Sequence, residues 1–256
     1  MEILYIERWL KAPVREEDGR LVPRERGTPQ GGVVSPLLAN LFLHYTLDRW
    51  LAAHYPQVPF ERYADDVIAH CRTEKEAQEM WKVIAARLQS CGLELQPEKT
   101  KIVYCKDDFR KKKYPNEKFD FLGYTFRPRS SMNRKGKFFI NFSPAVSNQA
   151  AKAIRDKFRS WKLPQRSDKA IDDLSRMFNP IIRGWIQYFG RYYRSALYPT
   201  MRELNRDLAL WAKQKYKKLR SHLREAKHWI ARISRRAPAL FAHWQMGARG
   251  SMMGAV

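Results

Sequence analysis

Residues 59–71 read PFERYADDVIAHC, and this stretch decides the fold of the first part of the chain. Two β-prone segments, 59–63 and 67–71, flank Ala64, Asp65 and Asp66, which predicts a β-hairpin with two adjacent carboxylates at its tip. Adjacent side chains diverge along a regular strand, whereas a tight turn lets both converge on a divalent cation that relieves their mutual repulsion. Asp65 and Asp66 are therefore candidate catalytic and metal-binding residues. Taken alone, the tetrapeptide with Tyr63 fits an ordinary acidic turn better.

The segments before this hairpin alternate between regular structure and loops. A short helix is expected over 1–12 and a hairpin over 13–25, turning at Glu17-Asp18-Gly19. Residues 26–36, RGTPQGGVVSP, are rich in Gly and Pro and are expected to form a loop. Ser35-Pro36 predicts a helix start, with serine as the cap and proline at the first helical position, and apolar residues recur at helical spacing down to Trp50.

The Gly-rich loop is a candidate ligand-binding element. Gly31 and Gly32 let the backbone approach a ligand closely, and Gln30 offers both a donor and an acceptor to a base or a sugar. Without the nearby aspartates, a plain Gly-rich loop would be the better interpretation.

The segments after the hairpin continue the same mixture of helices and strands. Thr73 and Glu76 form a capping-box pattern that opens a helix ending at Gly92. Short strands are expected over 93–96 and 101–105, around a turn that carries Lys99. That lysine could place a charge on a phosphate or supply a proton to a leaving group, and a solvated turn lysine is an equal alternative. Residues 119–126 and 137–142 are expected to pair across a long basic turn.

From about residue 147 the pattern becomes helical and strongly basic. Residues 151–256 hold 24 Lys and Arg against 7 Asp and Glu, whereas residues 1–150 hold 25 against 19. One helical stripe, Ile182 with Trp185, Ile186 and Phe189, is expected to be core. The opposite stripe is polar, and further basic residues follow it. Charged residues on a helix usually form a face exposed to water, but the local excess of positive charge favours RNA binding. The candidate RNA-binding residues are Arg183, Gln187, Arg191, Arg194, Lys213 and Lys217.

The order of these motifs resembles the later palm motifs and the thumb of group II intron-encoded reverse transcriptases/maturases. The stretch 179–189, NPIIRGWIQYF, is similar to the maturase-type thumb of that family. The resemblance implies nucleotide or template contact by Pro29, Gln30, Gly31, Gly32 and Tyr63. It implies metal binding by Asp65 and Asp66, with Lys99 near the incoming nucleotide, and a primer grip formed by Phe121, Leu122, Gly123 and Tyr124. The implied cofactor is Mg²⁺. The implied partners are group II intron RNA, an RNA template with a DNA primer, and deoxynucleoside triphosphates, in intron splicing and mobility.

The resemblance implies an α+β fold, with a partial reverse-transcriptase fingers/palm over 1–145 and an α-helical thumb/maturase domain over 146–256. It also shows a departure, because the family has a third catalytic aspartate on an earlier strand, and neither Asp18 nor Asp48 matches its context. We therefore expect a truncated polymerase that is incomplete alone and needs an N-terminal reverse transcriptase fragment, which is either supplied by another polypeptide or lost by truncation. The alternatives are a non-catalytic intron-RNA-binding module and a degenerate fragment.

Composition excludes several classes of protein. Cys71, Cys91 and Cys105 are widely spaced, which indicates neither a zinc site nor a disulfide framework. The N-terminal segment lacks the apolar core of a signal peptide, and no apolar run is long enough to cross a bilayer. These features predict a cytoplasmic protein associated with nucleic acid.

Overall fold

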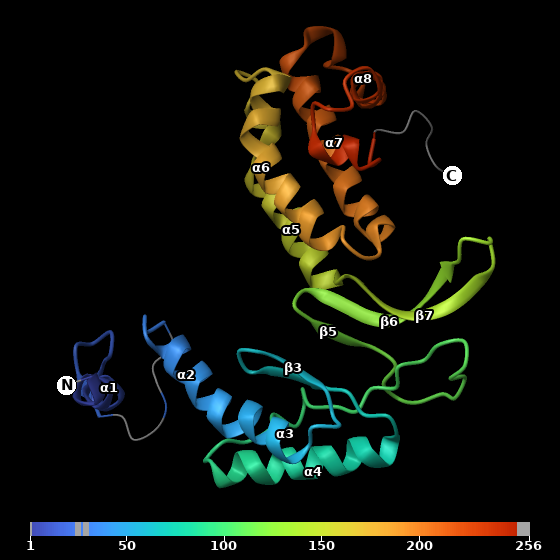
Figure 1. Ribbon diagram of the computed structural model, residues 1–256. Helices are drawn as coiled ribbons and strands as arrows, with labels where there is room; N and C mark the ends of the chain where they lie inside the picture. Colours follow the sequence, from blue (N-terminus) through green and yellow to red (C-terminus); the bar gives the residue numbers. More distant parts are fainter. Residues whose placement is uncertain (1, 24–26, 28–30, 250–256) are drawn as a thin grey trace. The chain divides into compact units, whose positions relative to one another are not determined.

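The computed structural model describes residues 2–23, 27 and 31–249 (Figure 1). The chain divides into two compact units, Met1–Ile102 and Val103–Val256, here called unit 1 and unit 2. Unit 1 combines helices with two small hairpins, and unit 2 joins a three-stranded sheet to a group of helices. The mixed α+β class predicted from the sequence is confirmed.

Unit 1 begins as the sequence predicts. Helix α1 covers Glu2–Lys11, and the strands β1 (Val14–Arg15) and β2 (Leu21–Val22) pair across the expected turn. The helix after the Gly-rich loop consists of α2 (Ser35–Leu43), a π-helical turn (His44–Asp48) and α3 (Arg49–His54). The predicted serine cap is wrong: Ser35 is the first helical residue, and its predecessor at the cap position makes no side-chain capping bond.

The core of unit 1 forms where the second hairpin packs with these helices. Strands β3 (Phe60–Tyr63) and β4 (Asp66–Ala69) pair antiparallel, and α4 covers Glu74–Ser90. The Thr73 hydroxyl accepts from the Glu76 amide, which confirms the predicted cap, whereas the Glu76 carboxylate accepts from the Arg72 amide. The buried centre consists of Leu47, Leu51, Val58 and Met80.

The predicted strands 93–96 and 101–105 are absent, since the described chain from 91 to 118 contains no strand. Two of the local amides, those of Lys99 and Thr100, donate instead to the Gln96 carbonyl within the turn. Pro97 removes a backbone donor, and the second segment crosses the boundary between the units, so neither segment finds a partner strand.

Unit 2 opens with a sheet of β5 (Phe119–Phe121), β6 (Tyr124–Met132) and β7 (Phe138–Val146), in that order. The predicted pairing of 119–126 with 137–142 is only partly right. Residues 119–126 are themselves a hairpin, and β6 continues through the segment predicted as a long turn, so that β6 and β7 pair over nine residues each.

The helical part of unit 2 begins directly after β7. Its helices are α5 (Asn148–Ser160), α6 (Ile171–Phe189), α7 (Tyr198–Lys215), α8 (Leu223–Arg236) and α9 (Ala242–Gln245). They enclose a core that includes Phe158, Trp211 and Trp244. The predicted apolar stripe of α6 faces this core, with Ile182 fully buried and the other three members packed against it.

Candidate active-site hairpin and nucleic-acid interface

The two aspartates lie at a two-residue turn of the β3–β4 hairpin. Tyr63 pairs with Asp66, so Ala64 and Asp65 form the turn and Asp66 is the first residue of β4. Ala64 has a φ of +53°, which costs a non-glycine residue about 1–2 kcal/mol. Asp65 and Asp66 are both exposed, as is Tyr63. The turn therefore presents two carboxylates to solvent at one end of the hairpin.

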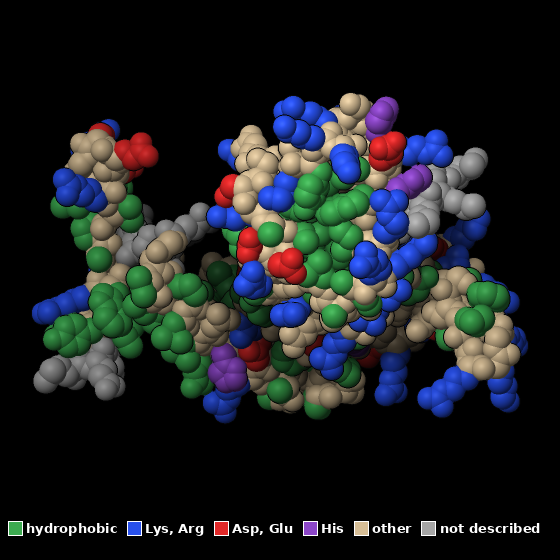
Figure 2. Space-filling view, turned by 90° about the horizontal axis from the view of Figure 1, so that it is seen from above, with side chains coloured by type: hydrophobic (Ala, Val, Ile, Leu, Met, Phe, Trp, Pro, Cys, Tyr) green, Lys and Arg blue, Asp and Glu red, His purple; other side chains and the backbone are tan. Residues whose placement is uncertain are grey.

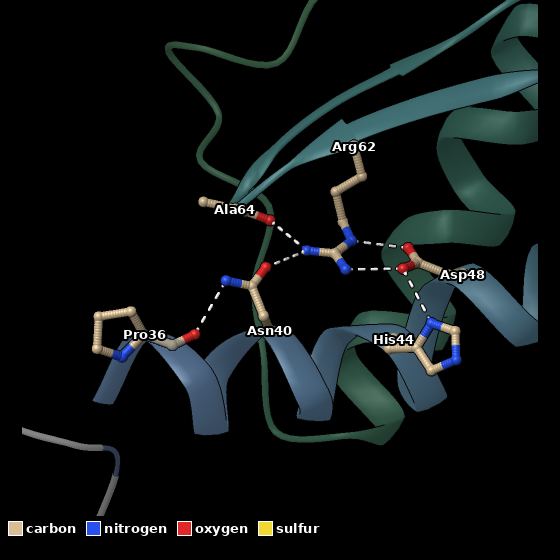
Figure 3. A network of polar contacts seen from close by, with 6 residues as sticks. All are labelled: Pro36, Asn40, His44, Asp48, Arg62 and Ala64. Carbon is tan, nitrogen blue, oxygen red and sulfur yellow. Dashed lines mark hydrogen bonds and ion pairs between the residues drawn. The ribbon is translucent and has the colours of Figure 1, made fainter. Parts of the chain in front are cut away.

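Arg62 connects this turn to the helix that follows the Gly-rich loop (Figure 3). Its Nε and one terminal nitrogen donate to the two Asp48 oxygens, both at 2.7 Å. The other terminal nitrogen donates to the Asn40 side-chain oxygen and to the Ala64 carbonyl, both at 2.8 Å. Asn40 in turn donates to the Pro36 carbonyl, and His44 lies 3.4 Å from Asp48.

This arrangement, the Arg62–Asp48 clamp, is well suited to fix the turn. The exposed fractions of the two side chains are only 11% and 20%, so water competes weakly for the pair. The hydrogen bonds from Arg62 hold the pKa of the Asp48 carboxyl below its ordinary value. The strained Ala64 residue is held by its carbonyl, which offsets part of its conformational cost.

Sequence reasoning missed the role of Arg62 and compared Asp48 only with the family's third catalytic aspartate. The sequence signal for the clamp is slight, since the two residues are 14 positions apart and belong to different elements.

The carboxylate pair offers part of a metal site. Carboxylate oxygens are the ligands that Mg²⁺ prefers, and it commonly uses one or two of them in phosphoryl-transfer sites. Among residues 2–23, 27 and 31–249, no group of three or more His, Cys, Asp or Glu side chains is placed to hold a metal ion. Asp65 and Asp66 thus fit Mg²⁺ in ligand chemistry and supply two of its ligands.

The structure shows little about the remaining candidate residues of unit 1, which are those of the Gly-rich loop and Lys99. Pro29 and Gln30 lie outside the described residues. Gly31 has a φ of +83°, a conformation that favours glycine, and Gly32 follows it just before α2. Lys99 is exposed in its turn.

The hairpin that resembles a primer grip is built into unit 2. Phe121 pairs with Tyr124, so Leu122 and Gly123 form a two-residue turn, with φ of +51° and +76°. Positive φ at both positions is what a type I′ turn requires, because it matches the strand twist. A Cβ on Gly123 would lie 3.2 Å from the Phe189 ring of α6.

Tyrosine hydroxyls fasten this turn to α6. Tyr188 donates to the Leu122 carbonyl at 2.9 Å, and Tyr124 donates to the Tyr188 carbonyl. Tyr124 is buried, and its ring packs with those of Tyr188 and Phe189. Phe121 is partly buried, and Leu122 is the more exposed side chain. The close approach of α6 thus explains why residue 123 is a glycine.

The candidate RNA-binding residues do not form the single helical stripe that we predicted. Arg183 and Gln187 are exposed on α6, but this helix ends at Phe189, so Arg191 and Arg194 follow it on non-α-helical backbone, where both are exposed. Gly190 ends the helix, and a Cβ there would meet the Ile186 carbonyl at 2.4 Å. Lys213 is half-buried on α7, and Lys217 is exposed just after it.

Two family models match the chain. Residues 1–126 match the family described as reverse transcriptase (RNA-dependent DNA polymerase), and residues 151–229 match the group II intron, maturase-specific domain. The chain belongs to the group II intron reverse transcriptases/maturases. Comparison with curated proteins gave no significant match.

The reverse transcriptase match of this maturase includes the aspartate turn, the Arg62–Asp48 clamp and the Leu122-Gly123 turn, and the maturase-specific match covers α6 and α7. No described helix is both long and apolar enough to cross a bilayer.

The positive charge of this maturase is concentrated in unit 2. Residues 103–256 contain 35 Lys and Arg against 11 Asp and Glu, whereas residues 1–102 contain 14 against 15. Lys and Arg predominate over Asp and Glu on the helical face that Figure 2 presents. The net charge of +24 thus belongs to the unit with the maturase-specific match, and the aspartate turn lies in a nearly neutral unit.

Proposed function

We propose that this chain binds group II intron RNA through unit 2 and contributes Asp65 and Asp66 to the magnesium site of an RNA-directed DNA polymerase. The observation that carries the RNA-binding proposal is the concentration of net charge in unit 2, +24 against −1 for unit 1. Such an excess repels itself in a compact unit, and a polyanion that neutralises it relieves the repulsion.

The local ion pairs leave much of this charge available. In unit 2, cations such as Arg110, Arg159 and Arg176 pair with acidic residues only three positions away. By contrast, no ion pair within the described residues involves Arg183, Arg191 or Arg194. These exposed guanidinium groups are free to form bidentate contacts with phosphates.

The polymerase proposal assigns distinct roles to the residues of unit 1. Asp65 and Asp66 would hold Mg²⁺, which, when bound, neutralises phosphate charge during nucleotidyl transfer. Arg62 would orient their turn. The Gly-rich loop, with Pro29, Gln30, Gly31 and Gly32, and Tyr63 would contact the template or nucleotide, and Lys99 a nucleotide phosphate.

The remaining assignments concern unit 2 and the functional boundary. We propose that the turn at Leu122-Gly123, with Phe121 and Tyr124, contacts the primer, and that the reverse-transcriptase part gives way to the maturase part near residue 145. Support for this boundary comes from the family models, which leave residues 127–150 unmatched between them.

The RNA-binding proposal is tested by measuring the affinity for a group II intron transcript over a range of salt concentrations. Replacing Arg183, Arg191 and Arg194 together by Gln should weaken binding and reduce the salt slope by up to about 2–3, because each phosphate contact contributes about 0.7–0.9. The matched control replaces three exposed cations of unit 1, Arg72, Lys75 and Lys82, by Gln.

The control removes the same charge from the chain but leaves unit 2 intact, so its slope should stay near that of the wild type. Equal effects of the two triple variants would contradict binding through unit 2. An unchanged slope in the Arg183 triple variant alone would show that these three residues form a solvated face. Absence of RNA binding by the unmodified chain would refute the proposal altogether.

A further inference from the structure

Strands β6 and β7 extend into a ribbon that reaches beyond the helices of unit 2 (Figure 1). The short β5 covers β6 only along Tyr124–Phe126, whereas β6 and β7 pair as far as Met132 and Phe138. The outer half of the ribbon is therefore two-stranded. Two-stranded ribbons are marginal in water unless one face is packed, so the side chains of the two faces require an explanation.

One face of the ribbon is held in place. The Arg129 guanidinium donates to the carbonyls of Thr125 and Ser143, both at 3.2 Å, and lies 5.3 Å from the Tyr193 ring. The Tyr193 hydroxyl also donates to the Ser130 carbonyl at 3.5 Å. This face is anchored on the segment that follows α6.

The opposite face is apolar and is covered only near its base. There the Phe126 and Phe142 rings lie 4.8 Å and 6.0 Å from the Phe119 ring. At the far end, Met132 and Phe138 are directly paired across the strands, yet their exposed fractions are 62% and 70%. Removing large apolar side chains from water is favourable, so this face is suited to a ligand that covers it.

Three cations lie in the loop that connects Met132 to Phe138. Arg134, Lys135 and Lys137 are exposed, and their side chains have no hydrogen-bond or ion-pair partner among the residues that the structure describes. The Asn133 side chain accepts from the amides of Lys135 and Lys137 at 2.9 and 3.0 Å, and the Asn133 amide donates to the Lys137 carbonyl. These hydrogen bonds fix the backbone that carries the three cations.

The residues of the ribbon itself carry charge of one sign, although an Asp108 side-chain oxygen from the preceding loop accepts from the Ile140 amide of β7 at 2.8 Å. No Asp or Glu occurs between residues 121 and 155. At the free end of the ribbon, at the right of Figure 2, hydrophobic side chains lie among those of Lys and Arg. A partner must therefore combine negative charge with flat apolar surface.

We propose that residues 132–138, here called the ribbon tip, bind single-stranded RNA, with a base against Phe138 and Met132 and phosphates at Arg134, Lys135 and Lys137. The inference rests on the proposed RNA-binding function and assigns to it a site outside the helical cations. Single-stranded RNA presents unstacked bases beside phosphates, which is the combination that the tip complements. In duplex RNA the bases are already stacked and paired, so Phe138 and Met132 would gain less contact from it.

The test measures the affinity of the full chain for a labelled single-stranded RNA of about ten nucleotides. Phe138→Ser should weaken binding about 5- to 140-fold, since base–aromatic stacking contributes about 1–3 kcal/mol per base. Phe138→Tyr keeps a stacking surface and should bind as the wild type does. Because the side chain is mostly exposed, neither variant should alter the circular dichroism spectrum.

A double-mutant cycle supplies the second test. The tip variant replaces Arg134, Lys135 and Lys137 by Gln, and the control variant replaces the exposed Arg224, Lys227 and Arg232 of α8 by Gln. The loss caused by Phe138→Ser should shrink several-fold in the tip variant but persist in the control variant, because only the tip cations hold the RNA against Phe138.

The outcomes separate this inference from the function on which it rests. If the wild type binds no RNA, the proposed function fails. If it binds RNA and Phe138→Ser changes nothing, the ribbon-tip inference fails alone. If Phe138→Ser instead dissociates a dimer in sedimentation while RNA affinity is unchanged, the tip is a self-association surface and the inference is overturned. Equal weakening of duplex and single-stranded RNA binding would also overturn the stacking role.

Discussion

Replacing Arg62 by Met tests whether the Arg62–Asp48 clamp fixes the aspartate turn. Hydrogen bonds to charged groups contribute about 1.5–3 kcal/mol, and breaking a fully buried ion pair costs about 3–5 kcal/mol. The exposed fractions of 11% and 20% make this pair partly buried, so its loss should cost less than that of a fully buried pair. The substitution leaves the Asp48 carboxylate without its main partner. We therefore expect the local free energy of unfolding to fall by about 2–3 kcal/mol.

Hydrogen exchange measured on peptides that cover β3 and β4 is the appropriate assay, because it reports the local opening of unit 1. A loss of about 2–3 kcal/mol corresponds to roughly 30- to 140-fold faster exchange. Arg62→Lys keeps the charge but not the planar guanidinium group. Its exchange rate should therefore lie between those of the wild type and the Met variant. The double variant Arg62→Met/Asp48→Leu should exchange more slowly than Arg62→Met, because no carboxylate is left unpaired.

The same variant has a defined pH dependence. The folded-state pKa of Asp48 is depressed, so its contribution is present above the unfolded pKa of about 3.9 and is lost as the pH falls through the lower folded pKa. The penalty of Arg62→Met should therefore be constant near neutral pH and shrink below about pH 4. An exchange rate within about two-fold of the wild type at neutral pH would place the pair among ordinary surface ion pairs and refute the reasoning.

Three further predictions concern other parts of the chain. Gly123→Ala should destabilise unit 2 by about 1–2 kcal/mol in urea unfolding, because the residue has a positive φ and faces the Phe189 ring; an unchanged midpoint would contradict this. The chain alone should not extend a primer, and extension restored by an added N-terminal reverse transcriptase fragment should be lost in Asp65→Ala; retained extension would remove Asp65 from the metal site. Burial lowers the pKa of His243 from 6.5 to about 3, so its imidazole is neutral in the folded protein at neutral pH. The unfolded state takes up a proton below pH 6.5, so the contribution of His243 to the free energy of unfolding falls as the pH drops below that value. Compared with His243→Gln, the wild type should lose about 3 kcal/mol between pH 7 and 4, measured by urea unfolding at each pH, and parallel curves would refute the assignment.

Local signals in the sequence predicted those elements of unit 1 whose causes are local. The cap at Thr73 and the hairpin around Ala64 depend on residues within a few positions of each other, and both are confirmed. The Arg62–Asp48 clamp could not be predicted, because it joins a strand to a helix through side-chain geometry that spacing does not reveal.

The sheet of unit 2 could be predicted only in part, because one of its turns is fixed by tertiary contacts. The turn at Leu122-Gly123 lacks the Asn-Gly or Asp-Gly pair that usually marks a two-residue hairpin, so the sequence did not separate β5 from β6. Its geometry is instead imposed by α6, through the Tyr188 hydroxyl and the Phe189 ring. A turn fixed by tertiary contact leaves only its glycine as a signal, and glycine fits a bulge equally well.

The end of the reverse transcriptase match and the boundary between the two compact units lie at different places in the chain. The reverse transcriptase match extends to residue 126, yet the compact unit that contains Gly123 begins at Val103 and includes the whole maturase-specific match. The Leu122-Gly123 turn is bonded to α6 by Tyr188, and the Ser147 amide at the start of α5 donates to the Gly123 carbonyl at 2.9 Å. A displacement of α6 or α5 must therefore displace this turn, since both helices contact its backbone. If the turn contacts a primer as we propose, this primer contact belongs to the same compact unit as the helices of the maturase-specific match.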